Sequence, residues 1–365
     1  MTHRYPAQVI GSLLRPSYLM EARNSFANGE ASATDLKQAE DRAVDQLIGM
    51  QEAAGLDIIT DGEMRRSVYF GPLVDAVDGI DRVESQVLPF RDQSGPNPVD
   101  IRTAITGKMK RRHSVVAEEY VYARARARKP LKVTVPSPMM VWTVWSAQHS
   151  TGAYSDPFEA CADAVDVIRA EVLELARLGC TYIQVDAAET GALVDPRIQE
   201  WSASVQGMSA ERMLTEGVEM IDACVADVPG VHFGLHLCRG NAPGVWLSEG
   251  GYDEIASEVF SRTPHFDTYL LEYDDDRSGS FQALSAVPDD KQVVLGLVSS
   301  KREELESAES LHSRISEAGK YFPQEQMALS TQCGFASGID GNPISDRTQE
   351  AKLRRVAEVA HSVWN

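Results

Sequence analysis

Four residues of types that bind transition metals fall near the ends of short apolar runs in the second half of the chain: His236, Cys238, Glu272 and Cys333. In a strand, residues i and i+2 point to the same side, so His236 and Cys238 would face one point. An imidazole, a carboxylate and two thiolates form a borderline-soft ligand set that suits Zn²⁺ in tetrahedral geometry. The pattern therefore predicts that these residues bind one zinc ion.

Each of these ligands alone is a weak indication. A single histidine on an apolar strand is more often a core histidine, and a single cysteine more often packs in the core. The joint placement at three predicted strand ends is what favours a metal site. Gly334 follows Cys333 and is expected to give the backbone freedom there. The other cysteines lie in helical, largely apolar patterns and are interpreted as core residues, and an odd number in a large chain argues against a disulfide framework. They are Cys161, Cys180 and Cys224.

The elements that must position the ligands alternate along the chain. Eight short apolar runs predict strands, namely Gln8–Leu13, Asp57–Glu63, Lys132–Ser137, Tyr182–Ala187, His232–Cys238, Thr268–Tyr273, Gln292–Val298 and Met327–Gly334. Longer segments with helical spacing separate them: Asp35–Ala54, Pro157–Leu178, Ala210–Val225, Tyr252–Phe260, Glu303–Ala318 and Arg347–Val363. This alternation predicts an α/β fold, a (β/α)8 TIM barrel, whose active sites form at the carboxyl ends of the strands. The alternative is a doubly wound open sheet, but no G-x-G-x-x-G follows the first strand.

One stretch interrupts the rhythm between strands 2 and 3. We expect a single barrel domain over residues 1–365, with residues 67–129 as an insertion that forms a hairpin and a helix over the barrel mouth. Its basic runs, Lys108–Arg112 and Arg124–Lys129, would either bind an anionic group or form a solvated helix face.

Composition narrows the classes of partner. The 35 Lys and Arg residues against 54 Asp and Glu residues give a net charge of −19, which disfavours nucleic acid and anionic membranes as partners. No apolar stretch of about 18 residues predicts a membrane span. Residues 1–8 carry no apolar segment of a signal peptide, so a cytoplasmic location is expected. A homo-oligomer is compatible with the sequence.

Six segments together resemble the cobalamin-independent methionine synthases, in particular the short members that have only the C-terminal catalytic barrel. They are VIGSLLRP near the start, TDGEMRR at 60–66, IQVDAAE at 183–189, HLCRGN at 236–241, LLEYDDDRSG at 270–279 and STQCGF at 330–335. In that family a histidine and a cysteine from H-x-C, a glutamate on the next strand and a cysteine in C-G bind zinc. The resemblance implies the same role for His236, Cys238, Glu272 and Cys333.

The resemblance also implies a reaction. A substrate thiol coordinates the zinc, loses its proton and attacks an electrophilic carbon. In the synthases the thiol is homocysteine and the carbon is the methyl group of a methylated folate. A second branch, the epoxyalkane:coenzyme M transferases, opens epoxides with a sulfonated thiol. The family's amino-acid pocket corresponds to Ser12, Glu63 and Asp186. The alternative is that the two carboxylates form ion pairs with Arg65, Arg66 or Arg239.

Two departures affect the alkyl donor. Ala187 and Ala188 stand where the synthases have Glu-Pro, and the strand-seven segment 297–301 lacks the family's D-x-H histidine that supplies a proton to the folate. Lys301 or a water molecule is expected to replace that histidine. Trp142 and Trp145, three residues apart, would form a stacking floor for a flat donor or a lid packed on the barrel.

Three functions therefore stay open. The first is a zinc-dependent methyltransferase or alkyltransferase acting on a small thiol. The second is an epoxide-opening thiol transferase or a carbon–sulfur lyase, which an anion-binding Arg239 or Arg15 near the zinc would favour. The third is a non-catalytic barrel with a closed structural zinc. We rank it last, because structural zinc sites usually come from C-x-x-C pairs on loops.

Overall fold

The structure is a computed structural model that describes residues 5–364, apart from the side chain of Ser85. Six parallel strands form one sheet in the order β10-β9-β8-β7-β6-β5, so each strand pairs with its neighbour in sequence. Their bounds are Val133–Pro136 (β5), Tyr182–Asp186 (β6), His232–Leu237 (β7), Thr268–Glu272 (β8), Gln292–Val298 (β9) and Met327–Thr331 (β10). Six of the eight predicted strands are thereby confirmed, with ends that differ by three residues at most.

The two remaining barrel positions are held by segments that pair too sparsely to form regular strands. A parallel bridge joins Ala7 to Leu329 of β10, and another joins Ile59 to Leu131 just before β5. The amide N–H of Asp57 donates to the carbonyl of Ala7, so the two segments also meet each other. The ring of eight positions is therefore closed, and the fold is the predicted TIM barrel.

In the second of these segments, around Thr60, side chains make hydrogen bonds to backbone groups that would pair with a neighbouring strand in a regular sheet. The Gln51 amide donates to the carbonyl of Thr60 (2.8 Å) and accepts from its N–H (3.0 Å), while the Thr60 hydroxyl donates to the carbonyl of Gly11 (2.8 Å). Buried backbone groups need such partners, and here a helix supplies them. This explains why two predicted strands became single bridges.

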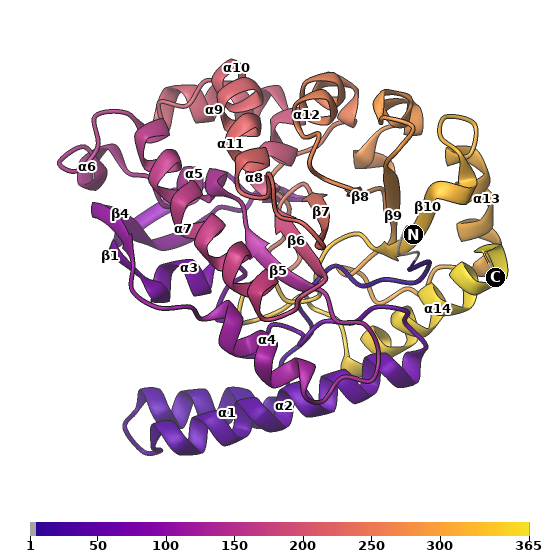
Figure 1. The fold of residues 1–365 in the computed structure, drawn as a ribbon, viewed down its shortest axis with the longest axis horizontal. Helices are drawn as coiled ribbons and strands as arrows, with labels where there is room; N and C mark the ends of the chain where they lie inside the picture. Colours follow the sequence, from indigo (N-terminus) through magenta and orange to yellow (C-terminus); the bar gives the residue numbers. More distant parts are fainter. Residues whose placement is uncertain (1–4, 365) are drawn as a thin grey trace.

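Helices cover the outside of the barrel (Figure 1). The longer ones are Ser17–Ala27 (α1), Ala33–Ala54 (α2), Val116–Arg124 (α4), Pro157–Arg177 (α7), Pro196–Val205 (α9), Ala308–Ala318 (α13) and Asp346–Trp364 (α14). Helix α2 begins at a capping box of Ser32 and Asp35 and ends at Gly55, whose φ is +91°. Helix α13 begins five residues later than predicted because Ser307 caps it.

Shorter elements complete the outer layer. They are Gly71–Ala76 (α3), Val141–Val144 (α5), Ala147–Ser150 (α6), Ala188–Gly191 (α8), Ala210–Arg212 (α10), Val218–Ala223 (α11) and Ala256–Arg262 (α12), with a π-helical turn Met213–Gly217 between α10 and α11. Several single turns of 3-10 helix lie in the loops. They are Pro138–Met140, Ala192–Val194, Tyr252–Glu254, Asp276–Ser278, Phe281–Ala286 and Gln324–Gln326.

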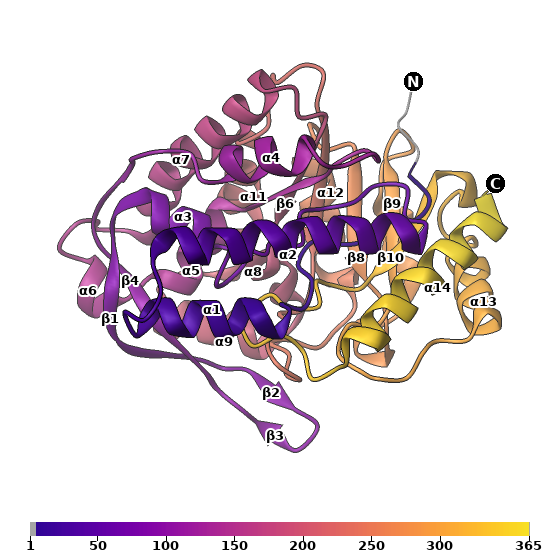
Figure 2. The same ribbon diagram turned by 90° about the horizontal axis from the view of Figure 1, so that it is seen from below.

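The segment 67–129 contains a long antiparallel hairpin. Strand Val77–Leu88 (β1) pairs with Val99–Arg111 (β4), and the tip carries the short strands Arg91–Asp92 (β2) and Gly95–Pro96 (β3). Figure 2 shows the tip projecting from the body, and a bridge from Arg91 to Trp246 ties it to the loop after β7. Helix α4 differs from the expectation, because it packs against α2, α7 and β5 in the outer layer rather than over the mouth.

The basic runs of this segment are paired with acidic residues. Arg111 lies 2.6 Å from Glu171, Arg126 lies 2.6 Å from Asp45, and Arg128 lies 2.8 Å from Glu52.

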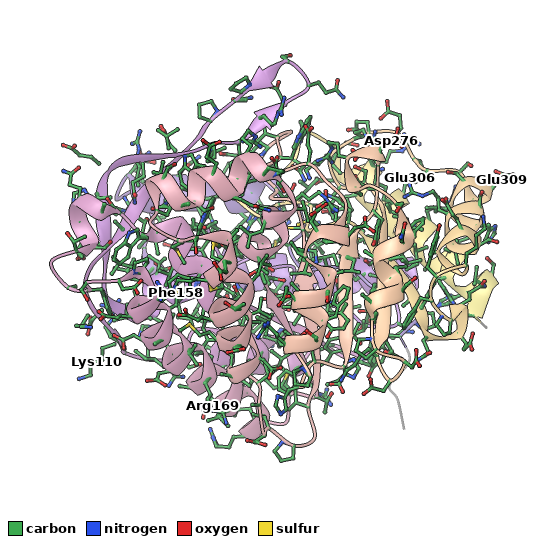
Figure 3. All side chains as sticks on the ribbon, turned by 90° about the horizontal axis from the view of Figure 1, so that it is seen from above. Lys110, Phe158, Arg169, Asp276, Glu306 and Glu309 are labelled. Atoms are coloured by element: carbon green, nitrogen blue, oxygen red, sulfur yellow. The ribbon has the colours of Figure 1, made fainter. Side chains whose placement is uncertain are left out.

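Figure 3 shows Lys110 and Glu309 at opposite ends of the molecule, while Phe158 lies within the helix layer, where it is buried. Within the described residues, no helix combines the length and the apolar character that crossing a membrane requires.

Candidate metal centre and its two chambers

Three of the four predicted ligands meet at the carboxyl ends of the barrel strands. His236 belongs to β7, Cys238 follows it directly, and Cys333 lies two residues beyond β10. Their potential ligand atoms all lie within 4.8 Å of one another, and the three side chains are buried. The i, i+2 spacing at the end of β7 turns the imidazole and the first thiol to one side, as the sequence predicts.

The imidazole is oriented for metal binding. Nδ1 of His236 lies 3.0 Å from the carbonyl oxygen of Leu270 and donates to it, while the buried Nε2 has no hydrogen-bond partner among the described residues. A backbone acceptor at one ring nitrogen fixes the tautomer that leaves the other free as a ligand. Hydrogen bonding from Cys238, assisted by His236, lowers the pKa of the Cys333 thiol well below its usual range. One orphaned nitrogen beside two thiols, one of them acidified, fits a zinc ion.

Glu272, at the end of β8, lies next to this cluster but outside it. Its Oε2 accepts the backbone N–H of Arg239 (2.8 Å), and its Oε1 lies 3.6 Å from Arg277 and 3.8 Å from Lys301 without a hydrogen bond. Burial raises the pKa of this carboxyl, but Lys301, Arg239 and Arg277 together lower it below its ordinary value. The group is thus a buried carboxylate with one free oxygen. Its role as the fourth ligand stays a prediction.

A small cavity, called the inner chamber below, adjoins the three clustered ligands and brings the predicted substrate residues to them. Ser12, Glu63 and Asp186 line it together with His236, Cys238 and Cys333. The side chains that the sequence places at three separate strand ends therefore face one space. The inner chamber contains no lysine or arginine among its described lining residues.

The two carboxyl groups of the inner chamber are held by neutral partners. Thr134 donates to Oε1 of Glu63 (2.9 Å), whose Oε2 has no partner, and Gln184 donates to Asp186 (2.7 Å). Burial raises the pKa of Glu63 and brings that of Asp186 to about 7. Arg66 lies 3.8 Å from Oε1 of Glu63, so the ion pair with Arg66 that the alternative interpretation expects is present, and it opposes the effect of burial. Buried carboxyls with free oxygens suit a positively charged substrate group.

Gly334 has a different role from the one expected. Its φ angle is not positive, so the conformational freedom of glycine is not what this position requires. A Cβ at this position would lie 2.0 Å from Oγ of Ser12 and 3.1 Å from its backbone nitrogen. Only glycine therefore lets the Cys333 loop approach Ser12 this closely.

A sulfonated thiol would need an arginine that is free to bind its sulfonate, but the guanidinium groups of Arg239 and Arg15 donate to backbone carbonyls. Arg239 is fully buried and donates to the carbonyls of Gly250, Glu272 and Ser278. Arg15 donates through Nη1 and Nη2 to the carbonyls of Ala336, Gly338, Glu63 and Arg66, so both guanidinium groups are bound to backbone carbonyls. The predicted donor-site role of Arg239 thus has no support in its contacts, since it holds loops behind the ligands.

A larger cavity of about 610 Å³, called the outer chamber below, lies against the inner one. Its lining includes Trp142 and residues of the hairpin, such as Ile80, Leu88 and Ile101. Tyr69, Ala188, Asn241 and Ser337 line both chambers. The hairpin therefore forms part of the wall of the outer chamber.

Trp142, Trp145 and Lys301 occupy three different environments. Trp142 lines the outer chamber, and its indole N–H donates to Ser202 (2.8 Å). Trp145 is buried and absent from the lining of both chambers. Lys301 lines a separate cavity, and its Nζ lies 3.8 Å from Oε1 of Glu272. The structure thus places only Trp142 at a chamber.

Sequence reasoning did not single out Glu189 and Tyr69. The Tyr69 hydroxyl donates to Oε1 of Glu189 (2.6 Å), and Glu189 lines the outer chamber although it is 2% exposed. The sequence does contain a signal for Glu189, which is a single acidic residue inside the small and apolar run 187–194. No comparable signal marks Tyr69, because its position depends on how the insertion folds back.

Comparison with known proteins gives one family. The profile of the family described as cobalamin-independent synthase, catalytic domain, matches residues 5–360. The uncharacterized protein YxjH of Bacillus subtilis (strain 168) is 33% identical over 368 residues, which cover 99% of this chain and 95% of YxjH. The methionine synthase of Sulfolobus acidocaldarius is 24% identical over 337 residues, covering 90% of this chain and 85% of that protein.

A solved structure has the same fold. The B12-independent methionine synthase from Shewanella sp. W3-18-1, in complex with selenomethionine, superposes with a TM-score of 0.78. The two chains are 19% identical, and the match covers 98% of this chain and 97% of that one. The two chains therefore share the barrel fold.

Proposed function

Because this chain belongs to the cobalamin-independent synthase family, whose catalytic domain it matches over nearly its full length, we propose that it transfers a methyl group to a small thiol. His236, Cys238 and Cys333 would bind a zinc ion, with Glu272 as the fourth ligand. When bound, the zinc ion would lower the pKa of a coordinating thiol and so supply the nucleophile. The observation that carries the proposal is the buried cluster of imidazole and thiols beside two substrate chambers.

The inner chamber favours an acceptor that carries an ammonium group, such as homocysteine. Glu63 and Asp186 present buried carboxyls to that space, and the free Oε2 of Glu63 can accept from an ammonium. Coenzyme M would instead bring a sulfonate, and Arg15 and Arg239 are already bound to backbone carbonyls. The Shewanella relative, with selenomethionine bound, contains an amino acid of the expected product type.

The outer chamber favours a large donor such as a methylated folate. About 610 Å³ of space can hold a flat ring system, and small-molecule sites commonly have such volumes. Residues Tyr69 and Ser337 at the boundary of the chambers would keep the donor's methyl group facing the thiol. An epoxide would fill little of this space, which is why a methyl donor is preferred.

Metal analysis of two cysteine variants tests the proposal. Purified protein should contain about one zinc ion per chain, and Cys333→Ser should lower that content sharply because a thiolate ligand is lost. The matched control is Cys224→Ser, whose buried thiol donates to the carbonyl of Met220 in α11 and lies outside the cluster. Equal zinc content in Cys333→Ser and the wild type would contradict the proposed site.

A further inference from the structure

Glu189 lies in a polar environment that the proposed zinc site does not use. It belongs to the short helix α8, directly after β6, and is 2% exposed. Its Oε1 accepts from the hydroxyls of Tyr69 (2.6 Å) and Thr143 (3.0 Å), while its buried Oε2 has no hydrogen-bond partner among the described residues. Two donors thus fix the carboxyl group and leave one oxygen unpartnered beside the outer chamber.

This carboxyl group lies at the boundary between the two chambers. Its hydrogen-bond partner Tyr69 and its chain neighbour Ala188 line both chambers, whereas Glu189 itself lines the outer one. A methyl group passing from donor to thiol must cross this boundary, with the thiol on the inner side and the leaving atom on the outer side. On that path the leaving atom would lie in the outer chamber, which Glu189 lines.

The environment favours the neutral acid. Burial raises the pKa of Glu189 above its ordinary value, although the hydrogen bonds from Tyr69 and Thr143 oppose this. Across residues 5–364 no ion pair within 4.0 Å joins Glu189 to a lysine or arginine. Burial of a carboxyl without a cationic partner favours its protonated form, which is the form that a general acid needs.

Lys301, the other candidate for this role, lies elsewhere. It lines a separate cavity, and its Nζ is 3.8 Å from Glu272 and 3.5 Å from the carbonyl of Gly240. Its ammonium group therefore stabilises the Glu272 carboxylate, and it is absent from the lining of the outer chamber. Glu189 is left as the buried acid at the chamber boundary.

We propose that Glu189 is the catalytic acid that protonates the leaving nitrogen of the proposed N-methyl donor, because that nitrogen cannot leave without a proton. This inference rests on the proposed thiol methylation. The thiol sulfur forms a bond to the methyl carbon, and the carbon–nitrogen bond breaks with its electron pair passing to nitrogen. That nitrogen takes the proton from Oε2 of Glu189. The proton released by the thiol enters solvent, and solvent returns one to Glu189, so protons and charge balance over the cycle.

The test compares two methyl donors with homocysteine as acceptor in zinc-loaded protein. 5-Methyltetrahydrofolate leaves as an amine and needs a proton, whereas methyl iodide leaves as iodide and needs none. Glu189→Gln keeps the shape of the neutral acid but cannot supply its proton. We expect it to slow transfer from the folate by about 100-fold or more, while its rate with methyl iodide stays within about threefold of the wild type.

Two further variants separate an acid from a structural residue. Tyr69→Phe removes one hydrogen bond that positions the carboxyl group, so we expect a loss of about tenfold with the folate alone. The matched control Glu171→Gln makes the same chemical change in a buried glutamate of α7, where Arg111 and Ser114 hold it away from both chambers. We expect this control to react like the wild type with both donors.

An infrared spectrum gives a readout that is independent of turnover. The difference between the wild type and Glu189→Gln, recorded without donor, should show the carbonyl stretch of a protonated carboxylic acid. Absence of that band, or equal slowing of Glu189→Gln with both donors, would overturn the assignment. A wild type that uses methyl iodide but not the folate would also overturn it. Failure of the wild type with methyl iodide would instead contradict the proposed thiol activation.

Discussion

At the scale of single residues, the close approach of Gly334 to Ser12 fixes the place of Cys333, the third proposed ligand. The carbonyl of Gly334 accepts from Asn241 (2.8 Å) and from Ser300 (2.9 Å), which fixes the loop that carries Cys333. The loop thus has little freedom to move away if a side chain is added. Small changes here should therefore affect metal binding before they affect the fold.

Gly334→Ala tests this reasoning. Its Cβ would lie 2.0 Å from Oγ of Ser12, so Ser12 or Cys333 must shift. Overpacking of this kind costs roughly 1–3 kcal/mol, and we expect zinc affinity to fall by about tenfold or more. The matched control is Gly338→Ala, where no atom lies within 4 Å of the added Cβ and φ is not positive. Competition with a zinc chelator measures both affinities, and equal values would show that the close approach does not matter.

The residues of the metal centre could be predicted because strand ends impose their positions. The H-x-C spacing fixes the sides to which His236 and Cys238 point, and parallel strands bring Cys333 to the same edge. Glu272 could be placed at a strand end, but its distance from the other proposed ligands could not be predicted. Arg239, Arg277 and Lys301 all compete for its oxygens. Such competition depends on loops whose course the sequence pattern does not specify.

At the scale of elements, helix α2 completes the barrel wall that the strands leave irregular. Gln51 is fully buried, and its side-chain amide makes hydrogen bonds with both backbone groups of Thr60. A helix that points one glutamine inward thus replaces part of a strand ladder. This arrangement holds the segment that leads to Glu63 in the inner chamber.

Gln51→Leu removes those bonds and leaves a buried N–H and carbonyl without partners. Each unsatisfied backbone group costs about 1–3 kcal/mol, so we expect the free energy of unfolding to fall by roughly 2–6 kcal/mol. Urea denaturation measures this change. Gln38→Leu, an exposed glutamine of the same helix, serves as the control and should change stability little. A similar midpoint for both variants would refute the role of α2 in closing the barrel.

The hairpin and the first two barrel segments show what sequence patterns miss at this scale. The apolar run 57–63 resembles the other strands, yet side chains of Gln51 and Thr60 take over its pairing. The sequence predicts a hairpin in the insertion. Its position at the outer chamber, however, depends on contacts such as the bridge from Arg91 to Trp246. Such long-range contacts leave no periodicity in the sequence.

At the scale of the whole molecule, one charge inside the barrel makes stability depend on pH. Lys132 is 1% exposed, and its Nζ lies 3.4 Å from the amide oxygen of Gln8. Burial lowers its pKa from 10.5 to about 7, although Asp186 opposes the shift. Between those values the unfolded chain binds a proton that the folded protein does not, so this group makes stability rise with pH from about 7 to 10.5.

Lys132→Met should remove that dependence. Below a pH of about 7 the folded wild type must bury an ammonium group, and we expect the variant to be more stable there by on the order of 5 kcal/mol. The difference should shrink as pH rises toward 10.5. Urea denaturation at about pH 6 and about pH 9 measures it. The exposed neighbour Lys129→Met is the control, and a gain in stability that does not vary with pH would contradict the account of Lys132.

The most direct test of the central claim is zinc-edge X-ray absorption of the metal-loaded protein with and without homocysteine. The proposed site has two cysteine sulfurs, and a thiol substrate that the metal activates must add a third to the ligand shell. We predict that sulfur coordination increases by one when homocysteine is added. A ligand shell that stays unchanged with saturating homocysteine would contradict thiol activation at this centre and would favour a closed, structural zinc.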